Sequence, residues 1–300
     1  MERLNFKKCA LCDKKTELQL SHIIPKFIGR HLKKTAIGNI RAGENPNNVV
    51  QDLEKHYMLC HDCEELFSAS ERWFANNVFY PWKRNKKDEF EYDKHFHFFI
   101  TSLSWRSLYL DIYYHVKNND IDIPSLNKMI EAEKIMKEYL LGARTDIGII
   151  ENHIFFFERV EKISGQNSTD FYMNPNVTIH RSVTSYSVAA GDTIFTISNL
   201  MGILVVTLYS KGSNEEWDRT KVKCDDGVIF AKEQKMKSVV GGEIQYWLEQ
   251  AEKQRQVLTP EQQKKIVDKI KALGEDIKNY AIYDDICDDI KLIRTTENDG

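Results

Sequence analysis

The sequence predicts an α+β protein with an N-terminal module stapled by zinc, residues 1–83, and a mixed helical and antiparallel β domain, residues 84–300. Two observations predict the layout. Two Cys-x-x-Cys pairs lie near the N-terminus, and helical and β-type apolar patterns both follow them. With 42% apolar residues, a chain of 300 residues can bury a core, and its length favours two domains.

The cysteine pairs are Cys9 with Cys12 and Cys60 with Cys63. A tetrahedral Zn²⁺ takes four thiolates at about 2.3 Å, and two such pairs supply them with little backbone strain. The remaining cysteines are isolated. This spacing favours structural Zn²⁺ over a disulfide framework, and it predicts a reducing, cytoplasmic setting.

An amphipathic helix is predicted after His22, because apolar residues recur at helical spacing over residues 23–32. Its opposite side carries the cations Lys26, Arg30, Lys33 and Lys34. Residues 1–43 hold ten Lys and Arg against three acidic residues, although the whole chain has a net charge of −3. Positive potential in the zinc module would attract a phosphate backbone, and a solvated lysine-rich surface is the alternative.

The module is predicted to continue with a short strand within residues 49–59 and a helix that begins at Cys63 and ends near Pro81. Residues 83–93 are charged and are interpreted as a linker. Two packed helices are expected beyond it, at residues 98–116 and 125–141.

The C-terminal half contains β-rich runs separated by turn residues, which predict a small antiparallel sheet. The runs are residues 153–160, 177–188 and 193–209. Helices are expected at residues 241–252 and after the capping residue Thr259. The last twenty residues, rich in Asp, are predicted to be a loosely held acidic tail.

The chemistry is concentrated near His22, in the sequence Ser-His-Ile-Ile-Pro that lies between the cysteine pairs. An imidazole titrates near neutral pH and therefore suits a general base. A buried core histidine or an alternative zinc ligand is the structural interpretation. Phosphate-binding glycine loops and dinucleotide fingerprints are missing from the sequence, which argues against nucleotide-driven chemistry, and no apolar run predicts a membrane partner.

This order of motifs resembles the HNH (ββα-metal) endonuclease family in its zinc-bearing, treble-clef form, over about residues 7–82. The resemblance implies that His22 activates water and that a catalytic Mg²⁺ or Mn²⁺ stabilises the charge on the phosphodiester. The family places a metal ligand directly after the second cysteine pair, where this chain has Glu64. Ser21 stands before the histidine, where the family usually has an acidic ligand.

The sequence departs from the family pattern at both of these ligand positions. One carboxylate and one imidazole are still present, with Glu64 as the anionic donor and the Ser21 hydroxyl as a weak one. The family's middle Asn, which orients the histidine, has no clear counterpart. The candidates in this chain are Lys55, Asn47, Asn48 and Asp52. Glu71 lies two helical turns, about 10 Å, beyond Glu64 and is expected to act indirectly.

The resemblance implies a metal-dependent endonuclease that hydrolyses DNA phosphodiesters, with DNA as partner and the basic helix face on phosphates. A protein activator and a setting in bacterial antiviral defence or a mobile element are expectations by analogy. The first alternative is a non-catalytic, zinc-stabilised module that binds nucleic acid or protein, which Ser21 favours. The second is a C-terminal sheet that senses a ligand or oligomerises. The sequence leaves the oligomeric state open.

Overall fold

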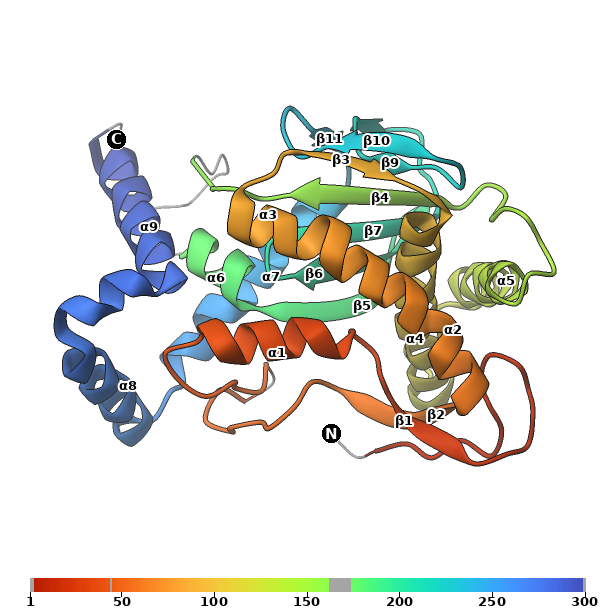
Figure 1. Cartoon of the computed structure of the whole chain (residues 1–300), viewed down its shortest axis with the longest axis horizontal. Coiled ribbons are helices and arrows are strands. Elements are labelled where there is room, and N and C mark those ends of the chain that lie inside the picture. The colour runs from red at the N-terminus through yellow and green to blue at the C-terminus, as the bar shows by residue number, and fades with distance from the viewer. Residues whose placement is uncertain (1–2, 44, 162–173, 299–300) are drawn as a thin grey trace.

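The structure is a computed structural model that describes residues 3–43, 45–161 and 174–298. It is a mixed α+β fold, as the sequence predicts (Figure 1). A five-stranded antiparallel sheet has the order β5-β6-β7-β4-β9, and helices α2, α4 and α5 pack together beside it. Among the helices of the described ranges, none is long and apolar enough to cross a membrane.

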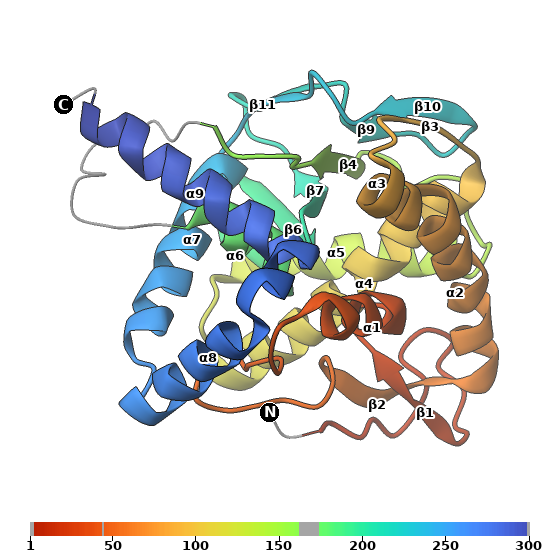
Figure 2. The same ribbon diagram turned by 60° about the vertical axis from the view of Figure 1, so that its left-hand side comes forward.

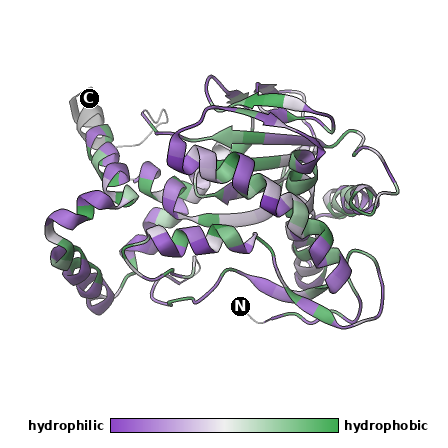
Figure 3. Cartoon of the chain, in the orientation of Figure 1, coloured by the Kyte–Doolittle hydropathy of each residue, from purple (hydrophilic) through white to green (hydrophobic). Residues whose placement is uncertain are grey.

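The N-terminal module is a β-hairpin followed by a helix, with a further helix inserted between the two strands. Strand β1 (Leu18–His22) pairs antiparallel with β2 (Lys55–Cys60), and α2 (His61–Phe74) starts directly after β2. The inserted helix is α1 (Lys26–Thr35). Its apolar side is buried and its cations are exposed, which confirms the predicted amphipathic helix, and α1 shows both colours in Figure 3.

The helix after the second cysteine pair was predicted to end near Pro81, but the structure differs. One π-helical turn, η1 (Ala75–Phe79), leads from α2 into α3 (Tyr80–Asn85), and Pro81 lies in the first turn of α3. Proline is tolerated there because its missing N–H would have no intrahelical partner.

The prediction that residues 83–93 form a linker is also wrong. Strand β3 (Glu89–Tyr92) pairs with β10 (Gly227–Phe230), and Phe90 and Tyr92 are buried. These two aromatics alternate with acidic residues, which is the pattern of a strand with one buried face. The strand was not predicted because most residues around these two aromatics are charged.

Helices α4 (Lys94–Asn118) and α5 (Ile123–Leu140) match the predicted helical pair. The Asp93 side chain caps α4 by accepting a hydrogen bond from the His95 N–H at 2.8 Å. Most of the first half of α4 is buried, because α4 packs against α2, α5 and the sheet. Because of this central position, α4 buries polar residues such as Ser104 and Arg106 as well as apolar ones.

The antiparallel sheet is confirmed, with one correction. The predicted run at residues 177–188 begins as a helix, α6 (Pro175–Arg181), because Pro175 suits a first helical turn. Met201 and Gly202, both with positive φ, form the tight turn between β6 and β7. The strands are β4 (Glu151–Phe156), β5 (Val183–Ala190), β6 (Thr193–Leu200), β7 (Ile203–Ser210) and β9 (Lys221–Val222).

The chain ends in a helical arm. Strand β8 (Glu216–Asp218) pairs with β11 (Lys235–Lys237), and the helices that follow are α7 (Val240–Gln256), α8 (Pro260–Leu273), η2 (Gly274–Asn279) and α9 (Ala281–Asn298). Thr259 caps α8, as predicted. The expected loose acidic tail is instead α9, which packs on α6 (Figure 2). The Asp289 carboxylate is buried and accepts hydrogen bonds from the Asn176 and Val177 amides.

The hydrophobic core contains residues from both sides of the expected boundary at residues 83 and 84. Ile28 and Phe79 of the N-terminal module lie in the same buried cluster as Leu200 and Ile203 of the sheet. A second cluster joins Cys9 and Cys60 to Trp105 of α4. The N-terminal module is therefore packed directly against the rest of the chain.

Candidate metal centre and catalytic site

The four cysteines of the two pairs form one cluster, and their Sγ atoms all lie within 4.8 Å of one another. Sulfurs at the corners of a tetrahedron around Zn²⁺ would be about 3.8 Å apart, given Zn–S bonds of about 2.3 Å. The Sγ atoms of Cys12 and Cys60 are 3.7 Å apart. The cluster could therefore hold a metal ion such as Zn²⁺.

Local structure brings the two pairs together. Asp13, with a left-handed φ of 60°, closes the first turn by donating its N–H to the Cys9 carbonyl at 2.9 Å. Cys60 ends β2 and donates its N–H to the Cys9 sulfur at 3.3 Å, while Cys63 lies in the first turn of α2. Lys137 of α5 donates to the Asp13 carboxylate at 2.7 Å, which connects this turn to a helix outside the N-terminal module.

His22 lies at the end of β1, opposite Lys55 of β2, and its side chain is 14% exposed. Its Nε2 is 3.2 Å from Oδ2 of Asp52. Because an ionised carboxylate only accepts hydrogen bonds, Nε2 is the donor and Nδ1 keeps its lone pair. Within the described ranges, Nδ1 has no hydrogen-bond partner. A neutral imidazole held in this way can accept a proton at Nδ1.

Asp52 is well placed to orient His22. Burial alone would raise the pKa of Asp52, but hydrogen bonds from Lys55 and His22 outweigh burial and hold this pKa well below its usual range. Lys55 Nζ donates to the same Oδ2 at 2.7 Å. The carboxylate therefore stays ionised at neutral pH.

Two of the four residues considered for orienting His22 lie beside its ring. Asp52 and Lys55 come together beside His22. Asn47 instead reaches the link between α7 and α8, donating to the Val257 carbonyl at 3.0 Å. Sequence reasoning missed Gly29: a Cβ atom there would lie 2.9 Å from the Leu53 side chain, so glycine lets α1 pack closely against the loop that carries Asp52.

Glu64 and Ser21 have different surroundings. Glu64 is in the first turn of α2, and its Oε1 atom is buried without a hydrogen-bond partner among the described residues. Ser21 is fully buried, and its hydroxyl accepts the Leu59 N–H at 3.2 Å within the hairpin. Over the described part of the chain, no hydrogen bond or ion pair joins Glu64 to His22.

Arg106 of α4 contacts His22 from outside the N-terminal module, and sequence reasoning missed it. Its Nη1 donates to the His22 carbonyl at 2.9 Å and lies 2.8 Å from the Glu71 carboxylate, so Arg106 joins Glu71 to the His22 backbone. The Arg106 side chain is 2% exposed. One feature of the sequence could have indicated this role: Arg106 is a lone arginine inside an apolar helical stretch. A buried arginine almost always has a polar or charged partner.

Replacing Arg106 by methionine is expected to lower the free energy of unfolding by about 3–5 kcal/mol, because it leaves Glu71 and the His22 carbonyl without their donor. Urea unfolding followed by circular dichroism measures this loss. Arg144→Met is the matched control: Arg144 is 35% exposed and lies 3.5 Å from Asp146, so its loss should stay below about 1 kcal/mol. Equal losses in the two variants would contradict the expectation.

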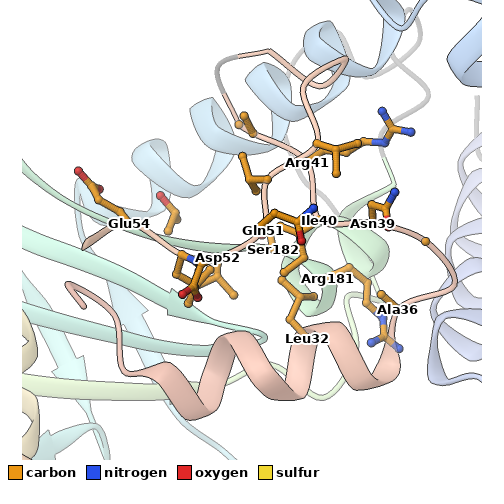
Figure 4. Close-up of a pocket in the computed structure, with 18 of the residues that line it drawn as sticks. Leu32, Ala36, Asn39, Ile40, Arg41, Gln51, Asp52, Glu54, Arg181 and Ser182 are labelled. Carbon is orange, nitrogen blue, oxygen red and sulfur yellow. Dashed lines mark hydrogen bonds between the residues drawn. The ribbon is translucent and has the colours of Figure 1, made fainter. Parts of the chain in front are cut away.

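A cleft of about 1860 Å³ lies beside this site, with Asp52 and Lys55 in its wall. Figure 4 shows Leu32 of α1 and Asp52 of the following loop facing it, with Arg181 from the end of α6. Seven Lys and Arg side chains line the cleft against four Asp and Glu. The excess of cations gives it a positive potential.

Asp111 of α4 also lines this cleft, and sequence reasoning did not select it. Burial raises the pKa of Asp111 to about 6, although the Ser187 N–H, which donates to its Oδ2 at 2.7 Å, opposes this shift. A carboxyl group in the wall of a cleft whose pKa is raised toward neutral pH is typical of functional sites.

Asp111→Asn is expected to stabilise the protein at pH 8 but hardly at pH 4. The folded pKa lies above the ordinary value of 3.8, so ionised Asp111 costs stability. This cost is absent below about pH 4 and complete above about pH 6, and it amounts to at most about 3 kcal/mol. Urea unfolding at both pH values measures it, and a gain independent of pH would contradict the buried-carboxylate explanation.

The four cations predicted to bind nucleic acid, Lys26, Arg30, Lys33 and Lys34, are all exposed on α1, directly after the site. The structure thus brings the zinc cysteines together, pairs His22 with Asp52 and keeps the basic face open to solvent. Comparison with known proteins adds no identification: no family model, curated protein or solved structure matches this chain.

Proposed function

We propose that this protein is a metal-dependent HNH-type endonuclease that hydrolyses DNA phosphodiesters, with a treble-clef zinc module. One observation carries the proposal: His22, at the end of a hairpin that the cysteine cluster holds, is oriented by ionised Asp52, and its other ring nitrogen has no partner among the described residues. This arrangement supports a general base that faces a reacting water.

Each residue of the site has a role in this proposal. His22 takes a proton at Nδ1 from the water that attacks phosphorus, and the bond from phosphorus to a sugar oxygen breaks. Asp52 fixes the ring and stabilises the imidazolium that forms. Lys55 keeps Asp52 ionised. Arg106 holds the His22 backbone in place through the carbonyl.

The proposed reaction also requires a catalytic Mg²⁺ or Mn²⁺, and Glu64 is the residue that would hold it. The fit rests on the buried Oε1 atom, which lacks a partner among the described side chains and would gain one by binding a cation. When bound, such an ion stabilises negative charge on the phosphate and the leaving oxygen. Ser21 serves the hairpin in this proposal, because its hydroxyl is already engaged there.

The charge distribution supports nucleic acid as the substrate. The exposed cations of α1 follow His22 closely in the chain, and the cation-rich cleft has Asp52, the partner of His22, in its wall. A polyanion that binds both surfaces would release counterions and bring its backbone close to His22.

The proposal is tested by incubating the full-length protein with supercoiled plasmid in Mg²⁺ and in Mn²⁺, with EDTA as the control. We expect nicked and linear products that appear only with the divalent ion. If a zinc-loaded protein leaves the plasmid intact in both ions, also after addition of a cell extract that could supply an activator, the proposal is wrong.

A non-catalytic nucleic-acid-binding module is the second candidate, and the buried Ser21 favours it. Where the family has an acidic ligand, this chain has the Ser21 hydroxyl, which already accepts a hydrogen bond from the Leu59 N–H. DNA binding that survives His22→Ala and Glu64→Gln but is lost when Lys26 and Arg30 are changed, in a protein that never cuts, would select this candidate.

A further inference from the structure

A group of cationic side chains gathers where the C-terminal end of α1 meets α3 and α6, away from the cysteine centre. We call it the cationic cluster; it consists of His31, Lys34, Lys83, Arg84 and Arg181. Ring and polar contacts hold it together. The rings of His31 and Tyr80 are 5.8 Å apart, the Arg84 guanidinium lies 4.3 Å from the Tyr80 ring, and Arg181 donates to Thr35 of α1 at 3.0 Å.

The cluster is short of negative charge. Its one acidic contact among the described residues is Asp285 of α9, which lies 3.3 Å from Arg181 and 2.7 Å from His180. Lys34, Lys83 and Arg84 form no ion pair in the described part of the chain. Lys83 instead lies with its Nζ 4.7 Å from the Trp82 ring.

Burial and the neighbouring positive charges lower the pKa values of two members of the cluster. Burial and, to a smaller extent, the charge of Arg181 together lower the pKa of Lys83 to about 7, although Asp285 opposes the shift. Burial also lowers the pKa of His31 to about 4, with Lys83, Arg181, Arg84 and Lys34 all acting in the same direction. Cations held together at such a cost are typical of a site that receives an anion.

The side chains suit a phosphate group in particular. The Arg84 guanidinium offers a planar pair of N–H donors, and the two lysines add compact charges. A phosphate oxygen can accept several of these hydrogen bonds at once. An apolar ligand or a cation would leave the repulsion within the cluster unrelieved.

We propose that the cationic cluster binds a phosphate group of the nucleic acid, a few nucleotides from the bond that His22 would cleave. The inference rests on the proposed function, because it takes the ligand to be that same substrate. It extends the interface predicted on α1 to residues of α3 and α6, beyond the zinc module.

The position of the cluster agrees with a continuous track along α1. Lys26, Arg30 and Lys34 are spaced by four residues and so share one face of the helix. From Lys26 to Lys34 the helix advances about 12 Å. One strand of B-DNA advances about 3.4 Å per nucleotide, so the cluster would bind a phosphate three to four nucleotides away from the one at the start of α1.

Docking of the acidic helix α9 explains only part of the cluster. Asp285 is already shared by His180 and Arg181, and Asp289 is engaged by the first amides of α6. Neither carboxylate forms an ion pair with Lys83 or Arg84 in the described ranges. These two residues are therefore the ones to change.

The first test measures binding of a fluorescein-labelled DNA duplex by anisotropy in EDTA, where cleavage cannot occur. Lys83→Ala with Arg84→Ala is expected to weaken binding about ten-fold or more and to lower the salt slope by about 2, because two phosphate contacts are lost. The matched control is Lys235→Ala with Lys237→Ala, two exposed lysines on β11. The control should bind within two-fold of the wild type.

The second test measures the wild-type protein and uses a conservative variant only to assign one signal. Lysines of the full-length protein are reductively ¹³C-methylated, the Lys83 signal is assigned with Lys83→Arg, and its pKa is measured by NMR with and without the duplex. We expect the duplex to raise the pKa of Lys83 by about one unit or more, because an anion favours the charged amine. Inorganic phosphate is the second probe.

The outcomes separate this inference from the proposed function. A double variant that binds the duplex like wild type, together with an unmoved Lys83 signal, overturns the cluster as a DNA contact and leaves the nuclease proposal intact. A Lys83 signal that inorganic phosphate moves but the duplex does not overturns nucleic acid as the source of the phosphate. Weakened binding in a protein that never cuts supports the cluster and removes the nuclease.

Discussion

Cys60→Ser is expected to remove the metal from the N-terminal module and to unfold it. Structural Zn²⁺ contributes about 10–16 kcal/mol in zinc-finger peptides at neutral pH, whereas whole domains are stable by only about 5–15 kcal/mol. Cys9, Cys60 and Cys63 are buried in the core cluster that contains Trp105. Loss of the ion would therefore also loosen the packing between α2 and α4.

Metal content by mass spectrometry and thermal unfolding by circular dichroism measure this effect. We expect one zinc ion per wild-type chain, less than a tenth of that in Cys60→Ser, and a large fall in the unfolding temperature. Cys287→Ser is the control, because Cys287 lies on α9 outside the cluster. Full zinc content and an unchanged unfolding temperature in Cys60→Ser would show that the four cysteines are not a metal centre.

Features set by local sequence were predictable. The apolar spacing after His22 gives α1, and the Thr259 cap begins α8, because both depend on residues within one or two turns. The charged run around Phe90 was predicted to be a linker but is a strand, and the β-branched run after Pro175 was predicted to be a strand but begins as a helix. In both cases tertiary packing or a single proline outweighed the composition of the segment.

The candidate site could be predicted only in part, because the chain assembles it from distant segments. The order and spacing of the sequence motifs predicted the cysteine cluster and His22. Asp52 was one of several candidates for the residue that orients His22. Only the folded loop brings Asp52 and Lys55 to the ring. Arg106 and Asp111 come from α4, and no local pattern links α4 to the hairpin.

His22→Ala is expected to reduce DNA cleavage by about 10²–10⁴-fold, which is the usual contribution of a general base. DNA binding in EDTA should stay within two-fold of wild type, because the cations of α1 and of the cleft are unchanged. Initial rates of plasmid nicking in Mg²⁺ and in Mn²⁺, with anisotropy for binding, separate the two effects. His61→Ala is the matched control, an exposed histidine at the start of α2.

The neighbouring residue gives a finer test of the same chemistry. Asp52→Asn keeps the size of the side chain but removes the charge that fixes the proton on Nε2 and stabilises the imidazolium. A smaller loss of rate than in His22→Ala is expected, again with normal binding. If His22→Ala and Asp52→Asn both cut as fast as His61→Ala, then His22 is a structural residue of the hairpin, and any cleavage by this protein depends on a different base.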